Sequence, residues 1–251
     1  MKAWLKQMTG VVSLVCGVWS AQAAEVQVAV AANFAAPMQK IAQAFEQDTP
    51  HRARVVVGST GGFYAQIKNG APFEVLLAAD DETPVKIEQD GLAVKGSRFT
   101  YATGRLVLWS KNPSLVDSKA EVLLLQRFDR LAIANPKLAP YGLAAAEMLS
   151  KANLWQSVQS NLVMGESIGQ TYQFVATENV PLGFVALSQV WADGKLTQGS
   201  AWIVPAHLHN PIKQDAVLLL KGQDNEAAKA LLNYLRGDKA KAIIRAHGYE
   251  L

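Results

Sequence analysis

The chain repeats one local pattern, in which a short buried strand leads through a polar turn into the start of an amphipathic helix. Valine alternates with smaller residues over 25–32, which predicts a strand, and Met38, Ile41 and Phe45 then follow on one helical face. Further strands are predicted at 54–57, 74–79, 131–134, 162–164, 181–187, 201–204 and 217–220, and one of the helices between them is predicted at about 119–127. Strands that alternate with helices at this spacing form parallel βαβ units. The predicted fold class is therefore α/β, with mostly parallel sheets flanked by helices.

The turn at 58–62, which reads GSTGG, is the most informative of these junctions. A helix that starts here directs unpaired backbone N–H groups and the positive end of its dipole at one point, which favours an anion. Ser59 and Thr60 add hydroxyl donors. No lysine or arginine occurs between Val55 and Ile67, so an anion here would be held by neutral donors. The alternative is an N-capped helix whose glycines only close a tight turn, since the loop matches neither G-x-G-x-x-G nor the complete P-loop.

Three other junctions place small or polar residues at the start of a helix. They are Ala32-Asn33, Pro140-Tyr141-Gly142 and Ser167-Ile168-Gly169. Asn33 stands where an N-cap belongs, with Pro37 in the first turn. Two of the four junctions fall in each half of the chain, and ligands of open parallel sheets bind outside the carboxyl ends of the strands. This arrangement predicts two lobes that close on one small anion.

An export signal is predicted at the N-terminus. Lys2 and Lys6 precede an apolar run over 8–19 that is too short to span a bilayer, and Ala21-Gln22-Ala23 is a small-x-small cleavage site. Cleavage after this site leaves 251 − 23 = 228 residues, removes Cys16, which is the only cysteine, and lowers the formal charge from +3 to +1. The mature chain is expected to be exported and soluble, without a disulfide, a cysteine-bound metal or a basic nucleic-acid face.

Three features suggest catalysis or metal binding, but each has a simpler explanation or lacks something that such a site requires. Asp80-Asp81-Glu82 precedes a predicted helix, where acidic residues commonly act as caps and dipole partners. His207 and His209 would share a face of a strand, but no third metal ligand stands nearby. Ser59 lacks the G-x-S-x-G context of a hydrolase nucleophile. A secreted hydrolase that uses Ser59 is the alternative from another functional class.

Short segments in order along the mature chain carry a family resemblance. They are Ala31-Ala32-Asn33-Phe34, Gly58-Ser59-Thr60-Gly61, Tyr64-Ala65-Gln66-Ile67, Gly70-Ala71-Pro72-Phe73, Ala78-Ala79-Asp80, Asn135-Pro136, Ala139-Pro140-Tyr141-Gly142, Ser167-Ile168-Gly169-Gln170, Leu182-Gly183-Phe184-Val185-Ala186 and Gly248-Tyr249. In these segments the chain resembles the periplasmic molybdate-binding proteins of ABC importers, within the type II periplasmic-binding-protein fold.

The resemblance implies two lobes behind a signal peptide at 1–23. Residues 24–104 and 214–251 would form lobe 1, and residues 105–213 would form lobe 2. The chain would cross between the lobes near 99–105 and near 211–215, so that closure is a hinge motion in which the ligand selects the closed state. The membrane permease of an ABC importer would recognise the closed form. The protein would act in the periplasm as a monomer and would not be an enzyme.

The resemblance also implies a tetrahedral dianion, molybdate or tungstate, held by neutral donors without a cofactor or a metal bonded directly to the protein. The donors carried over by position are Ala32, Asn33, Thr60, Tyr141 and Ile168, with Ser59 and Ser167 as secondary candidates. This chain departs from many members at two positions: Ala32 has no hydroxyl, and Ala186 replaces a tyrosine. The Tyr141 hydroxyl is the candidate replacement for that tyrosine. A receptor for sulfate, phosphate or another small anion on the same fold is the alternative.

Overall fold

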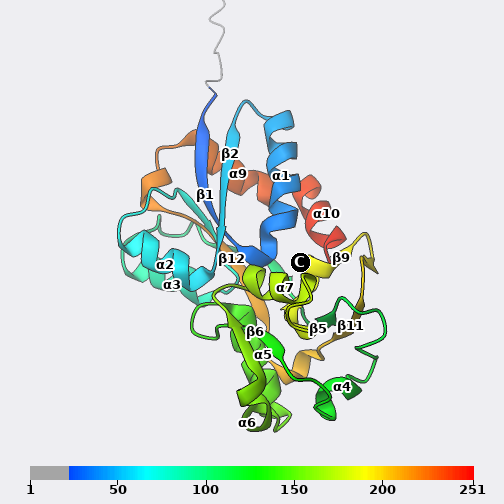
Figure 1. Cartoon of the computed structure of the whole chain (residues 1–251). Helices are drawn as coiled ribbons and strands as arrows, with labels where there is room; N and C mark the ends of the chain where they lie inside the picture. The colour runs from blue at the N-terminus through cyan, green and yellow to red at the C-terminus, as the bar shows by residue number, and fades with distance from the viewer. Residues whose placement is uncertain (1–22) are drawn as a thin grey trace, which may run out of the picture.

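The computed structural model describes residues 23–251, which fold around two separate five-stranded sheets (Figure 1). The first sheet has the order β2-β1-β3-β12-β4. Its strands are β1 (Glu25–Ala31), β2 (Arg52–Gly58), β3 (Val75–Leu77), β4 (Phe99–Gly104) and β12 (Ile212–Leu218). β1 pairs in parallel with β2 and β3, whereas β12 is antiparallel to both of its neighbours.

The second sheet repeats this arrangement with the order β11-β5-β8-β6-β7. Its strands are β5 (Leu106–Ser110), β6 (Leu131–Ala134), β7 (Leu162–Gly165), β8 (Leu182–Ala186) and β11 (Ser200–Ile203). β6 pairs in parallel with β7 and β8, and β5 and β11 complete the sheet in antiparallel fashion. Each sheet therefore has a parallel core, and the α/β prediction is confirmed.

Helices cover both faces of the first sheet, because its strands are apolar on both sides. Val26, Val28 and Val30 pack with α1 (Ala35–Asp48) and α9 (Glu226–Leu235). The intervening Ala29 faces the opposite core, to which α2 (Thr60–Lys68) and α3 (Glu82–Gln89) contribute Phe63, Ile67 and Ile87. The side-chain period of two along a strand thus supplies both cores. The C-terminal helix α10 (Asp238–Ala246) packs against α1 and α9.

The second sheet is covered in the same way. Leu131 and Ile133 pack in the core beneath α5 (Pro140–Lys151), and Ala132 faces the core beneath α7 (Ile168–Ala176). Shorter helices follow at the edges of this lobe: α4 (Glu121–Leu124), α6 (Trp155–Val158) and α8 (Leu187–Val190). A small hairpin joins β9 (Trp191–Ala192) to β10 (Lys195–Leu196).

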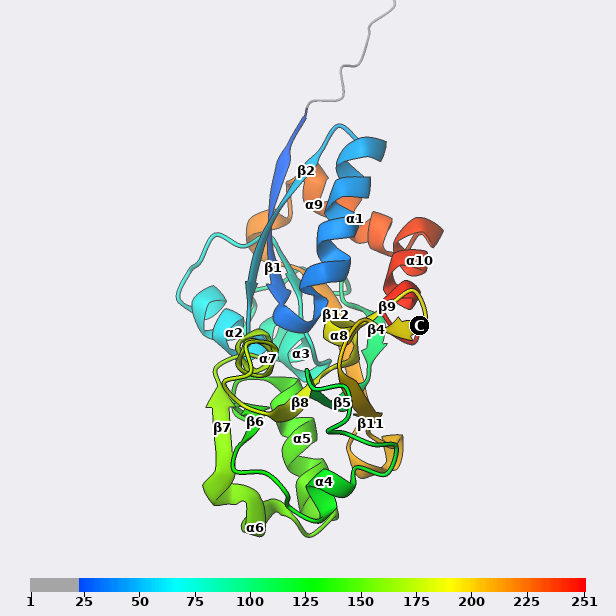
Figure 2. The same cartoon turned by 45° about the vertical axis from the view of Figure 1, so that its right-hand side comes forward.

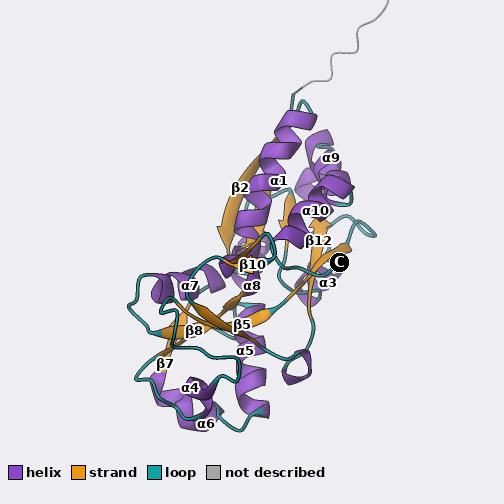
Figure 3. Ribbon diagram, turned by 90° about the vertical axis from the view of Figure 1, so that its right-hand side faces the viewer, coloured by secondary structure: helices purple, strands orange, loops and turns teal. Residues whose placement is uncertain are grey.

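Two segments connect the lobes, which lie one above the other in Figures 2 and 3. The first crossing is Arg105, between β4 in one sheet and β5 in the other. The second runs over 204–211, from β11 through the 3-10 helix Ala206–Leu208 into β12. Within residues 23–251, every helix is too short or too polar to cross a bilayer. The predicted signal peptide at 1–23 lies almost entirely outside the described residues.

Some sequence-based element assignments were wrong. The helix expected over 119–127 is the single turn α4, which buries Val122 and Leu123 but leaves Leu124 and Leu125 exposed. The strand expected at 217–220 is the end of β12, whose polar first half was not recognised. The histidine pair does not lie in a strand, because His207 belongs to a 3-10 helix and His209 follows it.

A buried carboxylate secures the second crossing. Asp215 is fully buried beside β4, where it pairs with Arg98 at 2.5 Å and accepts a hydrogen bond from the Thr100 hydroxyl at 2.7 Å. We expect Arg98→Ala to lower the free energy of unfolding by about 3 kcal/mol, because it leaves a buried charge without its cation. Urea denaturation measures this change. The control Arg105→Ala removes an exposed ion pair to Glu250 and should change stability by less than about 0.5 kcal/mol. Equal losses in the two variants would contradict the assignment.

Candidate functional site

The four junctions singled out in the sequence meet around one small cavity between the lobes. Its lining comprises Ala31, Ala32, Asn33, Gly58, Ser59, Thr60, Ala79, Ala139, Pro140, Tyr141 and Ile168. The five predicted donor residues and Ser59 therefore lie together, although they come from strand ends in two different sheets. Ser167 does not line the cavity; its hydroxyl caps α7 by accepting a bond from the Gln170 N–H at 3.2 Å.

The cavity lining is neutral. Among residues 23–251, those that line the cavity include no charged side chain. What the lining offers instead are backbone N–H groups in the first turns of helices, where no intrahelical acceptor is available. Such groups, together with the helix dipoles, favour an anion. The arrangement is suited to holding a small anion by fixed dipoles.

Thr60 presents a hydroxyl hydrogen to the cavity. Its Oγ1 accepts a hydrogen bond from the backbone N–H of Ala79 at 3.0 Å, so the oxygen is fixed and the hydrogen remains available to a ligand. Ser59 occupies the N-cap position of α2, yet its hydroxyl forms no cap bond within the described part of the chain. The alternative interpretation, in which the Ser59 side chain caps the helix, is therefore wrong about that cap bond. Both hydroxyls are available to a ligand.

The second lobe contributes the first turns of α5 and α7. In α5 the N–H groups of Gly142 and Leu143 both donate to Ala139 O, so the turn closes just after Tyr141. In α7 the Gln170 N–H donates to the Ser167 hydroxyl and the Thr171 N–H donates to Ser167 O. Ile168 precedes both of these residues in the first turn of the helix. Tyr141 and Ile168 thus lie where a helix N-terminus leaves backbone donors without an intrahelical partner.

Asn33 is not the N-cap that its position in the sequence predicted. It lies inside the 3-10 helix Ala32–Phe34, and its amide forms no cap bond among the described residues. Its Nδ2 group donates to Gln214 Oε1 at 2.8 Å and to the Tyr249 hydroxyl at 2.9 Å, which uses both amide hydrogens. The buried Oδ1 has no partner within residues 23–251. In this orientation Asn33 offers an anion its backbone N–H, and its amide would have to turn over to donate.

Asn33 belongs to a buried polar cluster that sequence analysis missed. We call it the hinge network, and its members are Asn33, Tyr101, Tyr141, Ser188, Gln214 and Tyr249. The Tyr141 hydroxyl accepts a bond from Gln214 Nε2 at 3.0 Å. Burial is the main cause that raises the pKa of Tyr101, Tyr141 and Tyr249 above the usual range, so these phenols stay protonated donors. The sequence singled out Asn33, Tyr141 and the Gly248-Tyr249 segment separately, but no sequence signal linked them to one another or to Tyr101, Ser188 and Gln214.

The lobes are closed over the cavity. The N–H of Gly61 donates across the cleft to Leu138 O at 2.9 Å, and the Ser188 hydroxyl donates to Asn33 O at 2.7 Å. A Cβ on Gly169 would come within 3.1 Å of the Ala32 side chain, so glycine permits the close approach of the lobes here. The cavity volume is about 10 Å³, which is at most the space that one ordered water needs. A tetrahedral oxyanion is larger, so its binding would widen the cavity.

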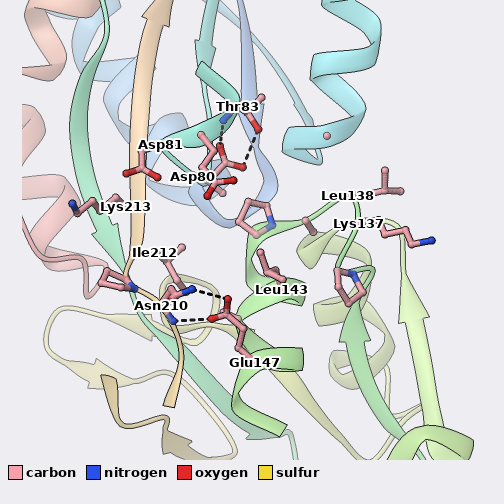
Figure 4. A pocket seen from close by; sticks show the side chains of 18 residues that line it. Asp80, Asp81, Thr83, Lys137, Leu138, Leu143, Glu147, Asn210, Ile212 and Lys213 are labelled. Atoms are coloured by element: carbon pink, nitrogen blue, oxygen red, sulfur yellow. Dashed lines mark hydrogen bonds between the residues drawn. The ribbon is translucent and has the colours of Figure 1, made fainter. Parts of the chain in front are cut away.

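Figure 4 shows a larger cavity, of about 320 Å³. It adjoins the small one and shares Ala79, Ala139 and Pro140 with it. Asp80 lines this larger cavity rather than the small one. Both of its carboxylate oxygens accept bonds from Thr83, from the backbone N–H at 2.8 Å and from the hydroxyl at 3.0 Å. This agrees with the expectation that the acidic run caps the helix that follows. Burial raises the pKa of Asp80 to about 6, against the lowering effect of the Thr83 bonds.

The acidic side chain on the lower wall of the larger cavity also has its hydrogen-bond partners within the protein. Figure 4 shows Glu147 below Asp80, and its carboxylate accepts bonds from the backbone N–H of Asn210 at 2.7 Å and from the Asn210 side chain at 2.9 Å. Within residues 23–251, no three His, Cys, Asp or Glu side chains lie together so that they could hold a metal ion. His209 Nδ1 instead lies 2.7 Å from Asn210 O.

Comparison with known proteins identifies relatives along nearly the whole described chain. Residues 26–250 match the family described as bacterial extracellular solute-binding protein. The molybdate-binding protein ModA of Azotobacter vinelandii is 61% identical over 232 residues, which cover 92% of each chain. ModA of Rhodobacter capsulatus is 50% identical over 229 residues, covering 91% of this chain and 89% of that one.

A solved structure supports the same relationship. The periplasmic molybdate-binding protein of Azotobacter vinelandii superposes with a TM-score of 0.87 and 41% sequence identity, over 90% of this chain and 99% of that one. The predicted periplasmic-binding-protein fold is thereby confirmed. The neutral cavity between two α/β lobes, the family match and these identities lead to one conclusion: the chain belongs to the bacterial extracellular solute-binding proteins, in the family of the molybdate-binding proteins.

Proposed function

We propose that this protein binds molybdate between its lobes and delivers it to the membrane permease of an ABC importer. The observation that carries the proposal is the convergence of four helix N-terminal junctions, two from each sheet, on one cavity with a neutral lining. The names of the relatives supply the ligand. By position, the donors are the backbone at Ala32 and Asn33, the hydroxyl and N–H of Thr60, and the N–H groups of Tyr141 and Ile168. The protein acts in the periplasm as a monomer after removal of residues 1–23.

Neutral, fixed donors suit a fully ionised tetrahedral anion. Dipoles held in place by helices lose little freedom when the ligand arrives, so little of the interaction energy is used for ordering. A protonated oxyanion such as hydrogen phosphate brings a hydrogen that needs an acceptor, and burying it unpaired costs about 1–3 kcal/mol. The carboxylate of Asp80 lines the neighbouring cavity and is engaged by Thr83, so it is not the acceptor. Tungstate has nearly the size and charge of molybdate and binds similarly.

The two lobes move as units about the two crossings. Residues 24–104 and 212–251 form lobe 1 and residues 105–211 form lobe 2, because β12 starts at Ile212 in the first sheet, two residues before the boundary expected from the sequence. The contacts Gly61 to Leu138 and Ser188 to Asn33 join residues from different lobes, so opening breaks them. The ligand enters the open form and selects the closed form, which is the form that the permease recognises.

Calorimetric titration of the purified protein with four anions tests the ligand. We expect tight binding of molybdate and tungstate with similar dissociation constants. Sulfate should bind much more weakly because it is smaller, so donors held by helices in both lobes cannot all reach it, and phosphate because of its proton. Tight binding of sulfate or phosphate without binding of molybdate would overturn the proposed function.

Substitution of Thr60 tests the site. We expect Thr60→Ala to weaken molybdate binding about 10- to 100-fold, because it removes one hydroxyl bond to a charged ligand while the backbone N–H remains. The matched control is Thr197→Ala, which removes a threonine hydroxyl bonded to Val190 O in the second lobe, away from the cavity. Calorimetry on both variants measures the change. An unchanged dissociation constant for Thr60→Ala would remove this hydroxyl from the site.

The buried carboxyl of Asp80 predicts a pH effect on stability. Its pKa of about 6 in the folded protein lies above the ordinary value of 3.8 for an aspartate side chain, so the folded state holds the proton more tightly than the unfolded chain. Ionisation therefore costs stability, starting above pH 4 and reaching its full extent above pH 6. Asp80→Asn abolishes this cost. We expect the stability of the variant relative to wild type to rise by about 2–3 kcal/mol between pH 4 and pH 7.5, measured by urea denaturation. A constant difference across this range would show that Asp80 titrates normally.

A further inference from the structure

A single buried glutamine connects the two lobes at the hinge. Gln214 lies on β12 just after the second crossing, is fully buried, and sits at an irregularity in the pairing of β12 with β4. Its Oε1 accepts bonds from Asn33 Nδ2 at 2.8 Å and from the Tyr101 hydroxyl at 3.0 Å, both in the lobe of the first sheet. Its Nε2 donates to the hydroxyl of Tyr141, which belongs to α5 of the other lobe.

The two residues joined in this way also line the anion cavity. Asn33 precedes α1 and Tyr141 lies in the first turn of α5, so the Gln214 amide ties together helix starts from opposite lobes. The first crossing adjoins the same contact, because a Cβ on Gly104 would collide with the Tyr141 hydroxyl and with Gln214 Nε2. Both crossings therefore adjoin this one amide.

We propose that Gln214 is a positioning residue that couples closure of the lobes to assembly of the anion site. Its bonds to Asn33 and Tyr101 lie within one lobe and can persist when the protein opens. Its bond to Tyr141 forms only when the second lobe closes. The buried amide is fully paired only in the closed form, and an unpaired buried amide is unfavourable. Gln214 therefore stabilises the closed form at the moment when Asn33 and Tyr141 reach their positions around the ligand.

The Gln214 amide also has a defined orientation, with Oε1 toward Asn33 and Nε2 toward Tyr141. Because Oε1 faces Asn33, Asn33 gives its amide hydrogens to the network and keeps Oδ1 unpaired within the described residues. A joint half-turn of the two amides keeps the Asn33–Gln214 and Gln214–Tyr141 contacts with their donors reversed, so that the Tyr141 hydroxyl donates to Oε1 and Nε2 donates to Asn33 Oδ1. It gives up the bond from Asn33 Nδ2 to the Tyr249 hydroxyl and the bond from the Tyr101 hydroxyl to Oε1. The turn frees Asn33 Nδ2 as a donor. Gln214 thus determines whether the Asn33 side chain can donate a hydrogen bond.

The test measures dissociation of isotopically labelled molybdate during a chase with unlabelled molybdate, and so rests on the proposed function. Gln214→Met keeps the length of the side chain and removes its hydrogen bonds. We expect the dissociation rate to rise about tenfold, because the closed form loses one buried bond, while the association rate of the open form stays within about twofold. A protein in which Gln214 only supports the fold would show a lower melting temperature without this change in dissociation.

The matched control is Thr100→Val. Thr100 lies on β4 and bonds Asp215, the neighbour of Gln214, so the variant loses a hydrogen bond at the same strand pair within one lobe. Its dissociation rate should equal that of wild type. A double-mutant cycle with Tyr141→Phe adds a second criterion: the two substitutions remove the same inter-lobe bond, so their effects on dissociation should not add. An unchanged rate in Gln214→Met, an equal rise in Thr100→Val, or additive effects would overturn the proposal.

A measurement without ligand separates this inference from the proposed function. Spin labels are attached through Gln43→Cys on α1 and Gln156→Cys on α6, which are exposed sites in different lobes, in protein without residues 1–23, which lacks Cys16. We expect Gln214→Met to shift the inter-lobe distances toward the open form in ligand-free protein. Wild type that fails to bind molybdate refutes the proposed function, and the distance shift still decides the role of Gln214. Unchanged distances in the variant would refute that role.

Discussion

Unpaired backbone N–H groups at helix starts are the constraint around which both lobes are organised. Each parallel strand that contributes to the cavity ends in a turn, and each turn starts a helix whose first N–H groups have no intrahelical acceptor. Because the two sheets face one another across the cleft, donors from both gather at one place. The geometry follows from chain direction in a parallel sheet, and it needs neither a metal nor a charged side chain in the described lining.

The second crossing combines several functions in a few residues. β12 returns the chain to the first sheet and carries two consecutive buried polar residues, Gln214 and Asp215. The Gln214 amide bonds Tyr141 of the other lobe, and the Asp215 carboxylate bonds Arg98 of its own lobe. Asp215 is held by Arg98 and Thr100, so that side of the hinge is fixed. Gln214 reaches Tyr141 across the lobes. A hinge of this kind has one rigid anchor and one contact that depends on closure.

Local pattern predicted most of the architecture but little of the polar chemistry at the site. The alternation over 25–32 and the helical spacing of Met38, Ile41 and Phe45 depend on near neighbours, and the structure confirms these elements. The partners of Asn33 are Gln214 and Tyr249, which are 181 and 216 residues distant in the sequence. A cap was the best local explanation for this asparagine, and long-range pairing overrides it. The failed helix at 119–127 has the same origin, since packing buries only one of its turns.

The neutral lining has a consequence for the medium in which such a protein works. Attraction between net charges is screened by dissolved salt over about 8–10 Å at physiological ionic strength, whereas short bonds from fixed dipoles in a closed cavity are screened much less. A site built from the N–H groups and hydroxyls around Thr60 and Tyr141 therefore gains little from long-range attraction and loses little to competing ions. Recognition by such a site is nearly independent of external salinity, which suits a compartment whose ionic composition follows that of the surroundings.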